Sequence, residues 1–129
     1  MLIQNIMSYE DFKNYLLKYK YIIINISAVW CKPCMLLKPK IEKFVSVIDN
    51  SDYIYLKLDN AIYDEESEFN TFFNFKKIPY FACIKDSKII DSFVSGDFPF
   101  VSKKIFDFVS KERVEDNKKC ESLEKSDDF

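Results

Sequence analysis

Histidine is absent from this chain of 129 residues, and neither sign of charge is in large excess. Without histidine, a zinc site would need cysteine ligands at matching spacing, and the sequence offers one close pair of cysteines and two that stand alone. The 19 basic and 21 acidic residues give a formal net charge of −2. That balance excludes the broad basic surface typical of proteins that bind nucleic acid or an anionic membrane.

Long apolar runs are also missing. No stretch reaches the roughly 18 apolar residues that a membrane-spanning helix needs. Residues 1–8 lack the basic segment and apolar stretch of a secretion signal. A cytoplasmic protein without a membrane span is therefore expected. In that setting four cysteines indicate free thiols or a working redox pair, because disulfide scaffolds belong to secreted domains.

Aromatic residues, by contrast, are abundant, with 13 phenylalanines and 8 tyrosines in a chain that is 48% hydrophobic. Such a composition fills the core of a folded body, and the length suits one domain. From Lys111 onward, large apolar side chains become rare. We therefore predict a folded domain over residues 1–110 and a charged extension over 111–129, a frayed helix or a disordered tail. A partner-binding tail is the alternative.

Hydrophobic periodicity predicts the order of strands and helices. Extended runs mark strands at 2–6, 21–26, 53–59, 80–84 and 88–94, and helical spacing marks helices at about 9–18, 35–48, 64–75 and from 98 onward. The run at 21–26 is uninterrupted and β-branched, which is typical of a central strand covered on both faces. Alternating strands and helices followed by a short hairpin predict an α/β fold, with a central mixed β-sheet flanked by helices.

The segment from Ser27 to Cys34 lies between the predicted central strand and the next helix, and it ends in a Cys-x-x-Cys pair. Two such cysteines can switch between a dithiol and a disulfide. Attack on a disulfide needs a thiolate, and the N–H groups and dipole at a helix start stabilise an anion. Cys31 is therefore the predicted nucleophile, and Cys34, one turn deeper, is the predicted resolving thiol.

Three neighbours complete the predicted environment of the pair. Lys32 adds a positive charge, Pro33 fixes the backbone between the cysteines, and Trp30 offers a flat apolar surface for shielding the nucleophile and contacting a substrate. The alternatives for the pair are incidental buried thiols or half of a zinc site. Cys83 is predicted to be a small core residue, and Cys120 an inert thiol, with a third redox thiol as the alternative.

The pattern Trp-Cys-x-Pro-Cys resembles the active site of the thioredoxin family, and the resemblance covers about residues 1–110. Further elements that carry it are, in chain order, Ser27-Ala28-Val29, Pro39, Lys57-Leu58-Asp59, Ile78-Pro79 and Gly96. The resemblance implies a thioredoxin fold and a protein-disulfide reductase that needs no metal or bound cofactor. It also implies a cis bond before Pro79 and a substrate platform formed by Trp30, Ile78 and Pro79.

Partners follow from the same resemblance. Members of the family act on oxidised client proteins through a transient mixed disulfide, and they receive electrons from a donor such as thioredoxin reductase or a glutathione system. We expect a monomer engaged in cell redox homeostasis, with neither nucleic acid nor a membrane as a partner.

Three departures from the family pattern bear on function. Lys32 stands where glycine is usual, which affects redox potential and partner choice. Asn25 stands where most members have a buried aspartate that takes the proton of the resolving thiol, so we predict slower resolution. Residues 60–77 form a longer segment than usual. The alternative function is therefore a thioredoxin-fold interaction module with slow or vestigial redox activity, which docks through that segment or the tail.

Overall fold

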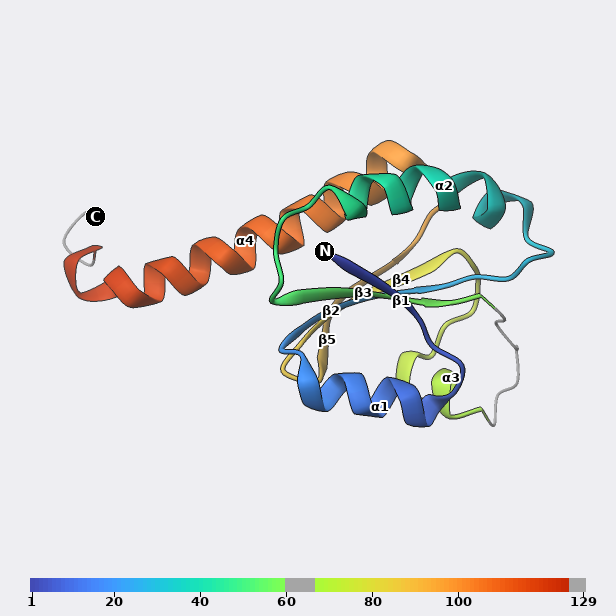
Figure 1. Ribbon diagram of the computed structural model, residues 1–129, viewed down its shortest axis with the longest axis horizontal. Helices are drawn as coiled ribbons and strands as arrows, with labels where there is room; N and C mark the ends of the chain where they lie inside the picture. The colour runs from blue at the N-terminus through green and yellow to red at the C-terminus, as the bar shows by residue number, and fades with distance from the viewer. Residues whose placement is uncertain (60–66, 126–129) are drawn as a thin grey trace.

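A five-stranded mixed sheet forms the centre of the protein (Figure 1). The computed structural model describes residues 1–59 and 67–125, and side chains as far as residue 111. The strands are β1 (Leu2–Asn5), β2 (Tyr21–Ile26), β3 (Tyr53–Leu58), β4 (Tyr80–Lys85) and β5 (Lys88–Val94), in the order β1-β3-β2-β4-β5. β3 runs parallel to β1 and β2, whereas β4 is antiparallel to both β2 and β5. The predicted mixed sheet with its hairpin is confirmed.

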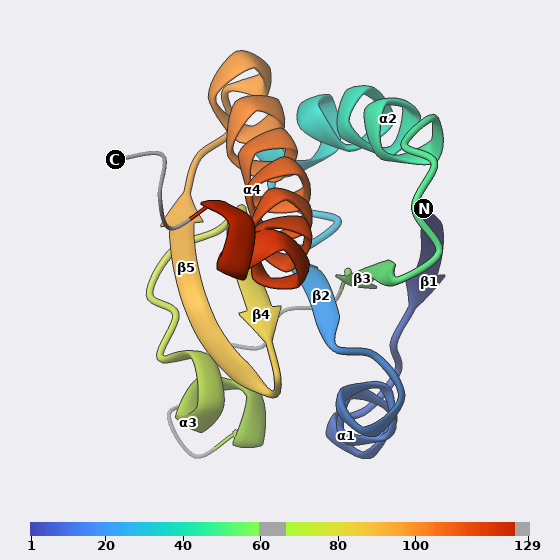
Figure 2. The same cartoon turned by 90° about the vertical axis from the view of Figure 1, so that its left-hand side faces the viewer.

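Helices cover both faces of the sheet, and Figure 2 shows the layers end-on. α1 (Tyr9–Lys18) and α3 (Glu68–Phe73) lie on one face, and α2 (Lys32–Ser46) and α4 (Phe98–Lys125) lie on the other. Aromatic rings fill much of the first layer, where Phe12 packs against Phe69, Phe72 and Phe73. Within the described residues, no helix combines the length and apolarity that a bilayer span requires.

β2 is the central strand, and all six of its residues are buried, including the polar Asn25. Ile22 and Ile24 belong to the core beneath α1 and α3, whereas Ile23 belongs to the core beneath α2 and α4. Successive side chains of a strand point to opposite faces, so an unbroken apolar run suits a strand covered on both sides. The prediction for residues 21–26 is confirmed.

α2 begins earlier than the hydrophobic spacing predicts. The spacing places its start at Met35, but the helix starts at Lys32, with Cys31 as its N-cap and Pro33 in its first turn. Proline is well tolerated there because its missing N–H has no intrahelical partner to lose. The polar and proline residues of this first turn carry no apolar periodicity, which explains the difference. Pro39 lies inside the helix, as the sequence indicates.

The bounds of α3 and α4 also bear on the sequence predictions. Ser67 caps α3 by accepting the N–H of Asn70 (3.0 Å), while the acidic start predicted at residues 64–66 lies outside the described residues. α4 starts at Phe98 as predicted and continues to Lys125, and Figure 1 shows its second half extending beyond the sheet. The predicted extension therefore begins as a continuation of α4.

Candidate active site

The cysteine pair lies where the chain leaves β2 and enters α2. Ser27 still belongs to the edge of the sheet, since its N–H donates to the Leu58 carbonyl (2.8 Å). The chain then turns, and the Cys31 N–H donates to the Ala28 carbonyl (3.1 Å). Because β2 and β3 are parallel, the carboxyl ends of both strands bring their following residues to this same edge.

Cys31 caps α2 with its own sulfur. Its backbone is extended (φ −89°, ψ 108°), and its Sγ accepts the N–H of Cys34 at 3.4 Å. Its carbonyl accepts the N–H of Met35 (3.0 Å), which begins the helical hydrogen bonding. N–H groups of a first helical turn have no intrahelical acceptor, and the positive end of the helix dipole adds to their effect. The site is therefore built to stabilise negative charge on Cys31.

The two cysteines are joined by a disulfide, and their Cα atoms are 5.3 Å apart. That separation lies within the usual range for a disulfide, about 4.4–6.8 Å. Both side chains are buried, with 7% of Cys31 and 3% of Cys34 exposed. The pair has the spacing needed to alternate between a disulfide and a dithiol.

An exposed apolar surface adjoins the pair. Trp30 is 67% exposed, and Ile78 is half-buried and packs against the cluster formed by Ala28, Cys31 and Cys34. The Ile78–Pro79 peptide bond is cis, as the family resemblance implies. The chain then enters β4, so the beginning of β4 and the end of β2 lie at one edge.

The single glycine of the chain packs against the Cys-x-x-Cys segment. A Cβ placed on Gly96 would lie 3.1 Å from the Cβ of Pro33, closer than ordinary van der Waals contact. The Ser95 N–H donates to the Pro79 carbonyl (3.2 Å), which holds this segment beside the start of β4. A side chain at position 96 would therefore have to displace Pro33 by a few tenths of an ångström, and close packing is what favours glycine there. The φ of Gly96 is not in the left-handed region, so its backbone does not call for glycine.

Asn25 lies beneath the site and is 8% exposed. Its Nδ2 donates to the Tyr80 carbonyl (3.3 Å), and its strand neighbour in β3 is Lys57. Lys57 is nearly as buried, and its Nζ lies 3.1 Å from Oε2 of Glu42 on α2. Thus a buried ammonium beneath α2 is neutralised by a helix carboxylate.

A second ion pair connects α2 to the end of β3. The Lys38 Nζ lies 3.2 Å from Oδ2 of Asp59, whose Oδ1 accepts the Ser27 hydroxyl at 3.4 Å. Lys38 is one helical turn beyond Cys34, so this pair ties the helix that carries the cysteines to the sheet edge.

Two tyrosines near these groups have perturbed ionisation. Burial is the main cause that raises the pKa of Tyr55 well above its ordinary value, and the charges of Glu42 and Asp59 raise it further. Among the described residues, the buried Tyr55 hydroxyl has no hydrogen-bond partner. Burial also raises the pKa of Tyr80, against the effect of a hydrogen bond with Ser92.

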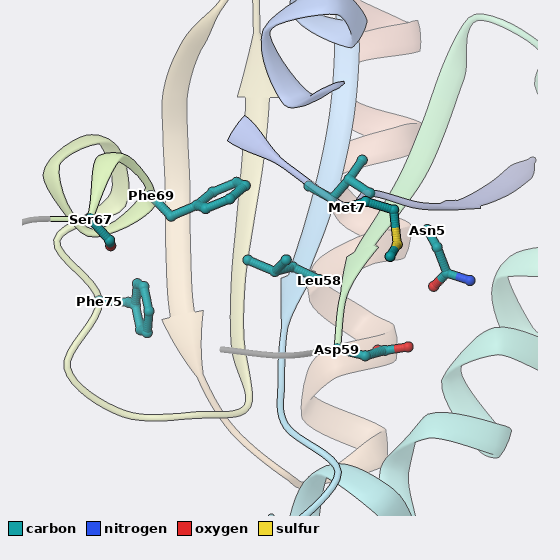
Figure 3. Close-up of a pocket in the computed structure, with 8 residues that line it drawn as sticks. Asn5, Met7, Leu58, Asp59, Ser67, Phe69 and Phe75 are labelled. Atoms are coloured by element: carbon teal, nitrogen blue, oxygen red, sulfur yellow. The ribbon is translucent and has the colours of Figure 1, made fainter. Parts of the chain in front are cut away.

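A cavity of about 450 Å³ opens beside the sheet edge, between the ends of β1 and β3 and the α3 region (Figure 3). Its lining residues are Asn5, Ile6, Met7, Leu58, Asp59, Ser67, Phe69 and Phe75. None of the residues that sequence reasoning assigned to the redox site lines it. The cavity meets the region of the cysteine pair only through Asp59, which accepts the Ser27 hydroxyl and pairs with Lys38.

The structure brings together most of the residues that the sequence singles out. Cys31, Cys34 and Ile78 share one cluster, Pro33 adjoins Gly96, and Asn25 lies on the strand that leads to the pair. Cys83 is completely buried among the residues beneath α2 and α4, as expected of a core residue. The side chain of Cys120 lies outside the described residues.

Sequence reasoning missed the two ion pairs and the Gly96 contact. Lys57, Asp59 and Gly96 were noted as parts of a motif, but their partners Glu42, Lys38 and Pro33 come from other elements. The available signal was the polar Lys57 inside an otherwise apolar strand, which indicates that a buried charge needs a partner.

Comparison with known proteins gives the family. Residues 4–110 match the family model described as Thioredoxin. The chain is similar to "Thioredoxin" of Malassezia sympodialis, with 30% identity over 95 residues that cover 74% of this chain and 88% of that protein. It is also similar to "Thioredoxin-2" of Pyricularia oryzae, with 28% identity over 99 residues. That match covers 77% of this chain but 55% of the Pyricularia protein, so the chain spans about half of that relative's length.

Solved structures agree with the fold. The crystal structure of Malassezia sympodialis thioredoxin superposes with a TM-score of 0.70 and 27% identity, over 84% of this chain and 94% of that one. The solution structure of oxidised Plasmodium falciparum thioredoxin gives a TM-score of 0.69 over 82% of this chain and 97% of that one. At 21% identity, that second likeness shows the fold alone.

Proposed function

The chain belongs to the thioredoxin family of thiol-disulfide oxidoreductases, and from this premise we propose that it reduces client disulfides with Cys31 as nucleophile and Cys34 as resolving thiol. The observation that carries the assignment of roles is the helix cap: the Cys34 N–H is directed at the Cys31 sulfur. The deeper burial of Cys34 supports the second role, because a resolving thiol needs to meet only its partner cysteine.

The first step forms a mixed disulfide. The Cys31 thiolate attacks one sulfur of the client disulfide, and a new bond forms between the Cys31 Sγ and that sulfur. The client S–S bond breaks, and the second client sulfur leaves as a thiolate that takes a proton from water. The helix N–H groups favour this step because they stabilise the attacking thiolate.

The second step releases the client. Cys34 loses its proton, and its thiolate attacks the Cys31 Sγ, so that the Cys31–Cys34 disulfide forms and the mixed disulfide breaks. The client sulfur leaves as a thiolate and is protonated. Over the two steps together the client gains two electrons and takes up two protons from the solvent. The protein, which starts as the Cys31 thiolate and the Cys34 thiol, loses those two electrons and releases the single Cys34 proton. Asn25 cannot accept the Cys34 proton, so we expect this step to be slower than in family members that carry aspartate at this position.

Trp30, Ile78 and Pro79 form the proposed client platform. Trp30 is exposed and directly precedes Cys31, and the half-buried Ile78 packs against the cysteine cluster. An extended client segment would pair with the backbone at Ile78 as an added strand. Lys32 and Pro33 form the wall on the α2 side.

The wider setting is also proposed. A return of the disulfide to the dithiol needs two electrons, and we propose a thioredoxin reductase or a glutathione system as their source. We further propose that the protein works as a monomer in the cytoplasm, in cell redox homeostasis. Residues 1–110 would form the catalytic domain, and 111–129 an extension that the chemistry does not use.

Insulin reduction coupled to a reductase tests the proposed function. The parent protein is expected to reduce insulin catalytically, and Cys31→Ser is expected to abolish turnover. Cys120→Ser is the matched control, since it removes a thiol outside the pair, and it should retain parental activity. A parent protein that is folded but inactive would contradict the proposal and would favour the interaction module.

Trapping identifies the clients. Cys34→Ser should stall the reaction at the mixed disulfide, so that clients stay bound through Cys31 until a reductant such as dithiothreitol releases them. The double variant Cys31→Ser/Cys34→Ser is the control. Equal recovery of proteins by both variants would show that the captured proteins are not held by the proposed disulfide.

A further inference from the structure

Three exposed lysines belong to the two segments that meet at the cysteine pair, and we infer from their placement that this protein prefers clients whose disulfide lies in an acidic segment. The inference rests on the proposed function, since it names the class of client for the same site.

The lysines come from the two segments that flank the sulfur. Lys32 directly follows Cys31 as the first residue of α2, and its side chain is exposed. Lys76 and Lys77 are exposed and directly precede Ile78, which packs against the cysteine cluster. Because neighbouring Cα atoms are about 3.8 Å apart, the Lys77 Cα lies about 4 Å and the Lys76 Cα at most about 7 Å from the Ile78 Cα. The beginnings of α2 and β4 share this end of the sheet (Figure 1).

These three charges have no counter-ion in the described part of the chain. No carboxylate there lies within ion-pair distance of Lys32, Lys76 or Lys77. The lysines farther along α2 and β3 differ, since Lys38 is paired with Asp59 and Lys57 with Glu42. Among residues 1–59 and 67–111, therefore, no carboxylate neutralises these three ammonium groups.

One described carboxylate lies on the segment that packs against Pro33. Asp97 follows Gly96, which packs on Pro33, but its Oδ2 accepts the N–H of Phe100 (3.1 Å) and so caps the first turn of α4. The rim formed by the exposed Lys32, Lys76, Lys77 and Asp97 carries three positive charges and one negative, although the formal charge of the whole chain is −2. The sign of the charge at the site is therefore opposite to that of the chain.

A positively charged rim raises the rate at which a client associates more than it raises the final affinity. Exposed charges steer an oppositely charged partner, and they reach about 10 Å at about 0.1 M salt but about 3 Å at 1 M. Glutamates within two residues of a client cysteine would come within that reach when the cysteine meets Cys31. We expect an acidic client to be reduced about fivefold faster than a neutral one at low salt.

Peptide substrates test this preference. Three disulfide-bonded peptides would be identical except at two positions on each side of one cysteine, which carry glutamate, glutamine or lysine. The second-order rate of their reduction by the reduced full chain would be measured at about 0.05 M and about 0.5 M salt. The expected order is glutamate, then glutamine, then lysine, with the differences shrinking at high salt.

Variants connect the preference to the rim. Lys76→Gln/Lys77→Gln should lower the glutamate-to-glutamine rate ratio about threefold. The control Lys18→Gln/Lys88→Gln removes two exposed lysines from the opposite end of the sheet and should keep the parental ratio. Turnover with equal rates for the three peptides, or a ratio unchanged by Lys76→Gln/Lys77→Gln, would overturn this inference alone. Failure to reduce any of the three peptides would contradict the proposed function itself.

Discussion

The amide nitrogen of Cys34 lies 3.4 Å from the sulfur of Cys31, with its N–H directed at that sulfur. Cys31 therefore caps α2 by accepting the N–H of Cys34, and Cys31 is also the proposed nucleophile. This arrangement explains why the pair must stand at the start of α2 and not within it. Negative charge on Cys31 meets N–H groups that otherwise lack an acceptor.

Replacing Asn25 with aspartate should speed release of the client. The carboxylate of Asn25→Asp would lie beneath the site and could take the Cys34 proton, which an amide cannot do. We expect mixed-disulfide resolution to become several-fold faster, about three- to tenfold, in stopped-flow measurements of the second step. The control Asn25→Ala should gain nothing, and a parent that resolves faster than Asn25→Asp would refute the proposed role.

Breaking the buried ion pair should destabilise the fold. Glu42→Gln leaves the Lys57 ammonium buried without a counter-charge, which we expect to cost about 1–3 kcal/mol of the free energy of unfolding. The control Glu10→Gln breaks the exposed Lys13–Glu10 pair and should cost less than about 1 kcal/mol. Urea denaturation measures both variants. Equal losses would show that burial of the Lys57–Glu42 pair is unimportant.

A side chain at position 96 should disturb the redox segment. Because a Cβ there would lie 3.1 Å from the Pro33 Cβ, Gly96→Val must push the Pro33 region away. We expect insulin reduction to fall about tenfold for Gly96→Val, and less for Gly96→Ala, since misplacing a reacting group by about 1 Å can be that costly. Parental activity of Gly96→Val with an unchanged melting temperature would contradict this packing argument.

The Tyr55 hydroxyl should contribute to stability in a pH-dependent way. Its pKa is raised in the folded protein, so the folded state holds the phenol proton that the unfolded state loses above about pH 10. The free energy of unfolding is therefore unaffected by this group below that pH. Above it, the free energy of unfolding falls by about 1.4 kcal/mol per pH unit for each such group. Tyr55→Phe should make this decline shallower in urea titrations between about pH 9 and 11.

Tyr80→Phe provides the contrast. The pKa of Tyr80 is also raised, so Tyr80→Phe should make the decline of stability at high pH shallower as well. At neutral pH the two variants should differ, because the Tyr80 hydroxyl donates to the Phe73 carbonyl (3.4 Å) whereas the Tyr55 hydroxyl has no described partner. We expect Tyr80→Phe to lose about 1 kcal/mol and Tyr55→Phe to lose nothing. A loss with Tyr55→Phe equal to that with Tyr80→Phe would contradict the assignment.

Local patterns in the sequence predict the elements and the cysteine pair well. β2 is recognisable because five of its six consecutive buried residues are apolar, with Asn25 the exception. Ser8 caps α1 by accepting the Asp11 N–H (3.1 Å), as its position indicates. The Cys-x-x-Cys spacing places both thiols on one turn of α2. In each case the interaction joins residues that are close in sequence.

Contacts between distant elements could not be predicted in the same way. The Asn25 amide meets the Tyr80 carbonyl across 55 positions of sequence, and Lys57 finds Glu42 because of how α2 crosses β3. Those pairings depend on strand order and helix placement, which apolar periodicity does not encode. The first turn of α2 was also missed, because Lys32 and Pro33 contribute no apolar spacing.

Selective alkylation of the reduced protein tests the central claim most directly. Iodoacetamide would be added to the reduced chain at neutral pH, and mass spectrometry would follow modification at each cysteine, with a free cysteine peptide as reference. The account predicts that Cys31 reacts first and at least about tenfold faster than the peptide, because the helix start holds it as a thiolate. A Cys31 no more reactive than the peptide, or a Cys34 that reacts first, would contradict the account.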